Sequence, residues 1–388
     1  MSTYTQVETN GLYELTDAAR SELISSKYYN EDLAPTSVSQ RTWTTYNISM
    51  LWVGMAICVP SLTLATGLVT AGISPWLAIL NVALGNFIIL IPIQLNANIG
   101  CRYGISFPGF ARITFGSRGA QLPILTRAFT ACGWVSVLAW VGGGAIAAAL
   151  GCFIPKFADP DWTVTLPSWG GMQTHSAGIF IGYIIFILLM AWVAYKGVGR
   201  IRVLQNIGGP ILLALLIGLL AWSVKIGSDA GFSFGDIMNQ HSTLHGRAIW
   251  GVYLTGLMGN IAFWAMMAFN IPDFSRYARS QKAYFRGQLY GLPVPMVFCA
   301  LVGAFYAQAA TLFNAANGLS EGKAGWYDPF DAIHVLYNID SKATVLITAL
   351  GVVIATLTTC IAANLVSAAN GFANLSPAKI SYKRGVFI

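Results

Sequence analysis

The spacing of charged residues limits what this chain can fold into more than any other feature of its sequence. Between residues 42 and 101 there is no Asp, Glu, Lys or Arg. Six further stretches also lack them: 128–155, 162–195, 203–224, 248–272, 287–320 and 343–378. A membrane-spanning helix needs about 20 mostly apolar residues to cross about 30 Å of hydrocarbon. The first stretch is long enough for two such helices, separated at Gly72-Ile73-Ser74-Pro75, and each other stretch for one. The sequence therefore predicts an all-α polytopic membrane protein with eight transmembrane helices.

The composition agrees with this prediction and excludes two other classes of protein. The 388 residues are 55% hydrophobic and 10% charged, and their mean hydropathy is +0.61. Soluble domains carry about 25% charged residues, because their surfaces face water. Disordered chains are poor in hydrophobic and aromatic residues. A soluble domain and a disordered chain are therefore both excluded.

The basic residues predict an orientation. Seventeen of the 22 Lys and Arg residues lie before span one, after span eight or in the even-numbered loops, and five lie in the odd-numbered loops. The positive-inside rule then places the N-terminus and the even-numbered loops in the cytoplasm, as in a multi-pass protein of the plasma (inner) membrane. Because the net charge of +7 comes from these loops, nucleic acid is not expected as a partner. We expect a polar cytoplasmic tail over 1–46, without a cleavable signal peptide, and a transmembrane transporter domain over 47–388.

The placement of ionisable groups argues against an enzyme. The acidic residues lie in the tail, in loops or, like Asp273, at the edge of a span. The histidines fall outside the span cores: His175, His241, His245 and His334. With no general acid, general base or metal ligand at depth, catalysis is not expected. The same pattern weakens a proton relay, which normally uses an intramembrane Asp, Glu or His.

Glycine and proline residues predict that two spans are broken. Span one contains Gly54, Pro60 and Gly67, and span six contains Gly251, Gly256, Gly259 and then Pro272. Broken helices at matching places in two inverted halves are typical of carriers, which favours a carrier over a channel or receptor. The alternative is that these residues serve packing and kinks, as Gly and Pro often do in membrane helices.

Polar and aromatic residues in the spans provide candidate ligand contacts. Ala355, Thr358 and Thr359 share one face of span eight, and hydroxyl oxygens beside unwound carbonyls suit a small cation such as sodium. Alternatively, each threonine bonds back to its own helix. Trp134 and Trp264 lie in mid-span, where they could stack on a flat ring or simply pack in the core. Four other tryptophans lie nearer the ends of their spans and are expected at the membrane interface: Trp52, Trp76, Trp222 and Trp250.

Several segments together resemble the nucleobase–cation symporter family, class one, whose members carry nucleobases, hydantoins, allantoin and related vitamins. The resemblance rests on Asn30-Glu31-Asp32-Leu33-Ala34-Pro35, Arg41-Thr42-Trp43, Arg127 with Gly133-Trp134 and Trp140-Val141-Gly142, Phe263-Trp264-Ala265, the segment 270–277, and Ala362-Ala363-Asn364-Leu365. It implies a leucine-transporter-like fold of two inverted five-helix repeats plus two peripheral helices. It also implies transport by alternating access, with no cofactor other than a coupling ion.

Residue roles follow from the resemblance position by position. Trp134 and Trp264 match the tryptophans that hold the substrate ring, and Asn364 matches an amide that bonds its polar edge. The sodium site is expected to use backbone carbonyls of Gly54, Ile57 and Ala355 and the hydroxyls of Thr358 and Thr359. The presence of both hydroxyls favours sodium over a proton as the coupling ion, although the family also has proton-coupled members.

The chain departs from the family at two substrate positions and in length. Leu138 and Cys58 stand where members often have glutamine, so Asn270 or Ser136 is expected to replace the lost hydrogen bonds, or the substrate is more apolar. The family has about twelve spans and this chain supplies eight, so the C-terminal helices are expected to be missing. A proton-coupled carrier and a non-transporting, receptor-like relative remain alternatives. The particular heterocycle and the oligomeric state do not follow from the sequence.

Overall fold

The computed structural model describes residues 6–9, 11–159, 161–168, 170–323, 325–331 and 341–388. His334 lies outside these residues. Within them, seven helices are long and apolar enough to cross a membrane, and one bent pair makes an eighth span, so the predicted number is confirmed. The spans are, in order, α2 with α3 (Thr45–Ala56, Val59–Thr70), α4 (Pro75–Tyr103), α6 (Gln121–Gly151), α7 (Ala177–Tyr195), α8 (Val198–Asp229), α10 (Arg247–Asn270), α12 with α13 (Gln281–Gly291, Pro293–Ala316), and α14, the π-helical turn η4 and α15 (Lys342–Thr359, Cys360–Leu365, Val366–Leu375).

The break in span one forms as predicted, just before Pro60. Helix α2 ends at Ala56, α3 begins at Val59, and the two are bent by 55°. Pro60 has no N–H to donate to the carbonyl of Ala56 four residues earlier, and its ring would clash with that carbonyl in a continuous helix. Cys58 is instead fully extended, with φ −148° and ψ 166°. The last carbonyls of α2 and the first N–H groups of α3 thereby lose their helical partners.

The predicted break in span six is wrong. Helix α10 runs without interruption from Arg247 to Asn270 and includes Gly256 and Gly259. A Cβ atom at Gly256 would lie 2.5 Å from a methyl carbon of Leu68, so this glycine allows α10 and α3 to approach closely. Small residues serve such close packing between membrane helices without breaking them. The helix ends only at Asn270, before Pro272 begins the short α11 (Pro272–Ser275).

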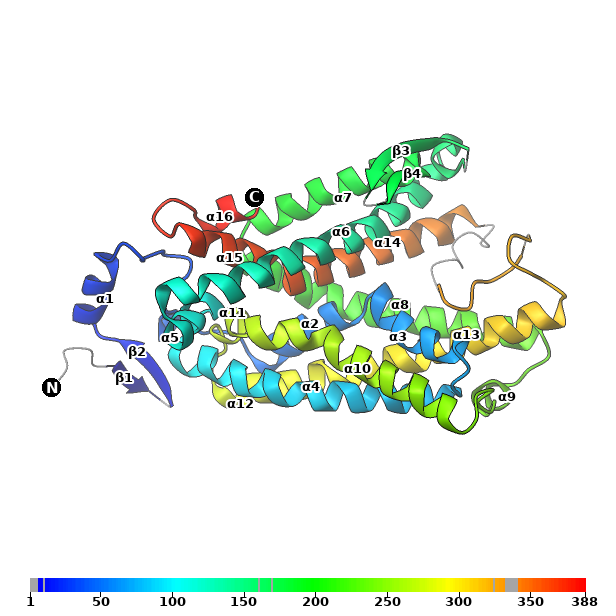
Figure 1. The fold of residues 1–388 in the computed structure, drawn as a ribbon, viewed down its shortest axis with the longest axis horizontal. Helices are drawn as coiled ribbons and strands as arrows, with labels where there is room; N and C mark the ends of the chain where they lie inside the picture. The colour runs from blue at the N-terminus through cyan, green and yellow to red at the C-terminus, as the bar shows by residue number, and fades with distance from the viewer. Residues whose placement is uncertain (1–5, 10, 160, 169, 324, 332–340) are drawn as a thin grey trace.

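The spans form a bundle in three rows (Figure 1). In that view α6, α7 and α14 lie along one edge, α4, α10 and α12 lie along the other, and α2, α8 and α13 lie between them. Glycines again set the closest approach, because a Cβ atom at Gly182 of α7 would lie 2.2 Å from the carbonyl oxygen of Gly143 of α6. The broken span is thus enclosed by helices on both sides.

Short elements cover the two ends of the bundle (Figure 1). One end carries the hairpin β1–β2, α1, η1, α5, α11 and α16, and the other carries η2, the antiparallel hairpin β3–β4 and α9. At the first end the bounds are Gln6–Thr9 (β1), Leu12–Leu15 (β2), Asp17–Ile24 (α1), Val38–Gln40 (η1), Phe107–Gly119 (α5) and Tyr382–Gly385 (α16). At the second end they are Pro155–Ala158 (η2), Thr163–Ser168 (β3), Gly171–Ser176 (β4) and Phe234–Met238 (α9).

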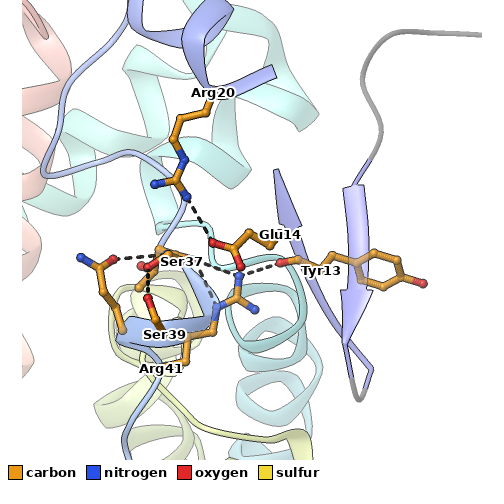
Figure 2. Close-up of polar contacts among 8 residues, drawn as sticks. Tyr13, Glu14, Arg20, Ser37, Ser39 and Arg41 are labelled. Atoms are coloured by element: carbon orange, nitrogen blue, oxygen red, sulfur yellow. Dashed lines mark hydrogen bonds and ion pairs between the residues drawn. The ribbon is translucent and has the colours of Figure 1, made fainter. Parts of the chain in front are cut away.

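The polar N-terminal segment is tied to the bundle through the buried Arg41. Its guanidinium donates to the carbonyl oxygen of Tyr13 at 2.7 Å (Figure 2). It also donates to the carbonyl oxygens of Thr36 at 2.9 Å and of Cys101, on α4, at 3.1 Å. An ion pair of 3.3 Å between Arg20 and Glu14 lies beside these contacts (Figure 2). The segment before span one therefore packs against the end of α4.

Candidate functional site

The break in span one faces span eight, and a side chain of α14 bridges them. The hydroxyl of Thr359 donates to the carbonyl oxygens of Gly54 at 3.2 Å and Met55 at 3.1 Å. These two carbonyls lie in the last turn of α2, just before the break at Pro60. Donation leaves the lone pairs of the Thr359 oxygen available to a ligand. Two of the five expected cation ligands, Gly54 and Thr359, are thus in direct contact.

Thr358 behaves differently from its neighbour. Its hydroxyl donates to the carbonyl oxygens of Ile354 at 2.9 Å and Ala355 at 2.8 Å, which is the backbone-bonding alternative open to a membrane threonine. Ala355 and Ile57 line an apolar cavity of about 310 Å³ between the break in span one, α3, α8 and α14. Gly54, Thr358 and Thr359 lie together where the end of α2 meets α14, which we call the crevice, and the cavity lined by Ile57 and Ala355 lies beside it.

Gln205 of α8 also reaches this crevice, although the sequence interpretation did not single it out. It is 1% exposed, and its Nε2 donates to the carbonyl oxygen of Thr358 at 2.9 Å. The carbonyl of Thr358 can only accept a hydrogen bond, so the group of Gln205 that faces it is the amide nitrogen. The amide oxygen of Gln205 therefore points the other way. That oxygen has no hydrogen-bond partner among the described residues, and it lies 1.8 Å from where a Cβ atom at Gly54 would be. A glutamine within a charge-free span could have drawn attention to Gln205, but the sequence does not show that its partner is Thr358.

The crevice contains oxygen atoms of carbonyls, hydroxyls and one amide. Within the described part of the chain, no group of three or more His, Cys, Asp or Glu side chains could hold a metal ion. Neutral oxygen ligands beside a broken membrane helix are the type of site that carriers use for sodium. The donor set therefore fits a small monovalent cation.

A second, smaller cavity lies beside the crevice. Its volume is about 40 Å³, and five of the six expected substrate residues line it: Cys58, Trp134, Leu138, Trp264 and Asn364. Thr359 lines it as well, and so it borders both the cavity and the crevice. The sequence positions judged to be substrate contacts are thus brought together from spans one, three, six and eight.

Aromatic rings fill much of the space around the two tryptophans. Phe263 contacts Trp134 at 6.0 Å and Trp264 at 5.0 Å between ring centroids, edge to face in both pairs. Trp52 contacts Trp264 at 5.4 Å and is completely buried, so its expected place at the membrane interface is wrong. Trp52 lies in the last part of α2, close to the break, and its side chain packs inside the bundle. By contrast, Trp76 and Trp250 are exposed, and their place at the membrane interface stays a prediction.

Neither expected replacement for the lost amides faces the cavity. Ser136 is exposed, and its hydroxyl donates to the carbonyl oxygen of Cys132 at 3.2 Å in its own helix. Asn270 is fully buried outside the cavity lining, and its Oδ1 accepts from Nε of Arg127 at 3.0 Å. Arg127 does line the cavity. The charge-free stretch assigned to span three begins only at residue 128, but α6 begins at Gln121, so Arg127 is a lone charge within this apolar helix.

The end of span eight adopts a wider helix around Asn364. Residues Cys360–Leu365 form a π-helical turn between α14 and α15, and Asn364 lies within it. Such turns are rare and occur frequently at functional sites. A regular 3.6-residue period, as assumed from the sequence, does not describe this turn. The turn rotates Asn364 relative to Thr359, and both residues line the cavity.

Asp273 lies beyond the end of span six and carries the buried carboxyl group nearest to this site. Burial raises the pKa of Asp273, while Arg276, the backbone N–H of Phe107 and the more distant Arg127 act in the opposite direction. Phe107 N–H donates to its Oδ1 at 3.0 Å. Asp273 also lines a separate cavity of about 380 Å³ together with residues of the N-terminal segment, among them Glu31 and Asp32.

Comparison with known proteins identifies the family. Residues 35–388 match the family described as permeases for cytosine/purines, uracil, thiamine and allantoin. The chain is 39% identical over 361 residues to the purine-uracil permease NCS1 of Arabidopsis thaliana, covering 92% of this chain and 56% of that protein. It is 30% identical to the allantoin permease of Bacillus subtilis, covering 94% of this chain and 70% of that protein. The chain thus spans a little over half the length of the plant relative.

Solved structures confirm the expected leucine-transporter-like fold. The nucleobase-cation-symport-1 family transporter Mhp1, in a closed conformation with bromovinylhydantoin bound, matches with a TM-score of 0.70 at 22% identity, covering 93% of this chain and 72% of Mhp1. MhsT in complex with L-phenylalanine matches with a TM-score of 0.60 at 19% identity, covering 88% of this chain and 76% of MhsT. With eight apolar spans, the chain is an integral multi-pass membrane protein. It belongs to the nucleobase–cation symporter family, class one, a family of permeases and not of enzymes.

Proposed function

We propose that the protein is a cation symporter that imports a planar nucleobase-like, hydantoin-like or allantoin-like heterocycle by alternating access, with sodium as the coupling ion. The observation that carries this proposal is the position of Thr359. One residue lines the aromatic cavity and also contacts the broken helix at the crevice of oxygen ligands. Relatives named as purine-uracil and allantoin permeases support the choice of substrate class.

In this proposal, Trp134 and Trp264 stack on the heterocycle and Asn364 bonds its polar edge. Stacking of a base on an aromatic side chain stabilises binding by about 1–3 kcal/mol per base in nucleic-acid sites. The cavity of about 40 Å³ is much smaller than the roughly 300 Å³ of a typical ligand site. The bound ring therefore requires a more open conformation, in which Phe263 moves away from one of the two tryptophans.

The cation is held in the crevice by the carbonyls of Gly54, Ile57 and Ala355 and the hydroxyls of Thr358 and Thr359. Thr358 must rotate away from its backbone acceptors to contribute, and the amide oxygen of Gln205 supplies one further ligand. Cation binding draws α14 and α8 toward α2. Because Thr359 also lines the cavity, this movement changes the shape of the cavity. Coupling of this kind is reciprocal, so the heterocycle tightens cation binding by the same factor.

The topology completes the proposal. Residues 1–46 form a cytoplasmic tail, residues 47–388 form the transport domain, and the protein lies in the plasma (inner) membrane. The excess of basic residues before span one and in the even-numbered loops supports this orientation. Cysteine accessibility at Lys27→Cys and Lys156→Cys in intact cells tests it, because the two positions should lie on opposite sides.

Proton coupling is the second candidate, and Asp273 favours it. A buried carboxyl group whose pKa is raised, near the inner end of spans three and six, could carry a proton instead of a cation in the crevice. Uptake of labelled uracil and allantoin into proteoliposomes separates the candidates. An inward sodium gradient at constant pH should drive accumulation under the sodium proposal, and a pH jump without sodium should drive it under the other. Binding without accumulation would identify a receptor-like protein.

A further inference from the structure

Another cavity lies further along spans six and eight than the aromatic cavity of about 40 Å³. Met267 lines the aromatic cavity, and Asp273, later in the chain, lines the cavity of about 380 Å³, which we call the end cavity. Asn364 lines the aromatic cavity, and Val366 and Asn370, later in the same span, line the end cavity. Both spans run toward the end of the bundle that carries the N-terminal segment (Figure 1). The end cavity therefore lies between the aromatic cavity and that end.

The side chain of Arg127 joins three spans at the boundary between the two cavities. Its Nε donates to Oδ1 of Asn270, at the end of span six, at 3.0 Å, and its Nη2 donates to the carbonyl oxygen of Ala363 in span eight. Arg127 and Ala363 line the aromatic cavity, whereas Asn270 is completely buried and belongs to neither lining. Burial raises the pKa of Asp273 and the charge of Arg127 opposes that rise, so the guanidinium acts on a residue of the end cavity.

The end cavity has the size and the polarity to receive a small ring. Asp273, Arg276 and Asn370 are buried in its wall, while Glu31 and Lys383 also line it and are exposed, so it extends to the protein surface. Its volume falls within the roughly 300–1,000 Å³ of typical small-molecule sites. A heterocycle that leaves the aromatic cavity toward this end of the bundle would enter the end cavity before it reaches water.

We propose that the end cavity is the chamber through which the heterocycle is released, and that the hydrogen bond between Arg127 and Asn270 is the gate between this chamber and the aromatic cavity. The inference rests on the proposed transport function and assigns the inner part of its path. While the bond is made, the ends of spans three and six are held together. When it breaks, Arg127 stays bonded to Ala363, and span six moves away from spans three and eight. Because the bond exists only in the closed conformation, it shifts the equilibrium toward that conformation.

The reactivity of Cys58 tests the gate, because Cys58 lines the aromatic cavity and is 4% exposed. A membrane-impermeant thiol reagent is added to either side of vesicles that contain a parent variant in which alanine replaces the other cysteines. A cysteine-free variant with Lys27→Cys marks the side on which the N-terminus lies. Asn270→Ala removes the acceptor of a charged donor, so the reaction rate of Cys58 from that side should rise roughly tenfold or more over the parent. No rise, or an equal rise from both sides, would overturn the inference.

Two further variants separate a gate from a structural contact. Asn374→Ala is the matched control, because Asn374 is also completely buried and joins span eight to span three through Gln121 at 3.2 Å, but lines neither cavity. It should leave the Cys58 rate unchanged, and an effect equal to that of Asn270→Ala would refute the gate. Asn270→Asp offers Arg127 a charged acceptor, which should hold the gate closed and slow heterocycle uptake roughly tenfold without weakening ring binding. If Asn270→Ala does not fold, Asn270→Asp decides, and unchanged uptake in it refutes the gate.

The ring itself separates failure of the gate from failure of the proposed function. Saturating uracil or allantoin should protect Cys58 from the reagent in both the parent and Asn270→Ala, because the ring and the thiol share one cavity. Protection in the parent together with an unchanged rate in Asn270→Ala refutes the gate and leaves the proposed function standing. A one-sided rise in Asn270→Ala that neither ring prevents supports the gate and counts against the proposed substrate class.

Discussion

The hydroxyl of Thr359 lies 3.2 Å from the carbonyl oxygen of Gly54, which joins span eight to the broken span one beside the aromatic cavity. The two residues are 305 positions apart in the chain. Their contact depends on Pro60, because only a broken helix leaves mid-membrane carbonyls open to a side chain from another span.

Removing the Thr359 hydroxyl should weaken cation binding. Thr359→Val keeps the shape of the side chain but removes the bond to Gly54 and one ligand oxygen, so we expect sodium affinity to fall roughly tenfold or more, as for one lost buried hydrogen bond. Thr359→Ser should restore it. The measurement is the sodium concentration that gives half-maximal thermal stabilisation. Thr356→Val is the matched control, since Thr356 is equally buried in α14 and bonds only Val352 at 2.6 Å. An equal effect of both valine variants would contradict the assignment.

Gly54 should tolerate no side chain while Gln205 is present. A Cβ atom there would meet the Gln205 amide oxygen at 1.8 Å, so Gly54→Ala should displace the amide and reduce the sodium response. Adding Gln205→Ala should remove the steric clash but not restore the response, because the ligand oxygen is then absent. Gly251→Ala on α10 meets nothing within 4 Å and is the control. A normal sodium response in Gly54→Ala would show that Gln205 is not part of the site.

Trp264 should contribute most of the stacking energy. Trp264→Ala should weaken heterocycle binding by about 1–3 kcal/mol, and Trp264→Phe should weaken it less, because a π face remains. Trp250→Ala removes an exposed tryptophan from the same helix and should have no effect on binding. Isothermal titration calorimetry with the ligand that binds best measures the difference. Unchanged affinity in Trp264→Ala would exclude stacking on this residue.

Much of this architecture follows from the sequence, but the contacts between distant helices do not. Charge-free stretches located the eight spans, and Pro60 together with two glycines located the break in span one, although Pro92 and Pro210 lie inside the continuous helices α4 and α8. Gly256 packs against Leu68 and was wrongly interpreted as a break in span six. The expected substrate residues came from the mid-span positions of two tryptophans and from family resemblance. The pairing of Arg127 with Asn270 and of Gln205 with Thr358 joins separate spans and depends on how these helices pack.

Asp273 should make stability depend on pH. Because burial raises its pKa above the usual value of about 4, the folded protein holds the proton more tightly than the unfolded chain does. The stability associated with the protonated form is complete below about pH 4 and is lost as pH rises through the raised pKa. Asp273→Asn cannot ionise, so its melting temperature should rise relative to the unmodified protein across that interval. A difference in melting temperature that does not change with pH would contradict the raised pKa.

The most direct test of the whole account is the affinity of the purified protein for uracil or allantoin, measured at increasing sodium concentration with choline keeping the ionic strength constant. The account predicts that at least one of these rings binds, that its affinity rises with sodium, and that the ring increases sodium affinity by the same factor. Binding that is identical in sodium and choline, or no binding of either ring, would contradict the claim that a shared residue couples a heterocycle cavity to a sodium site.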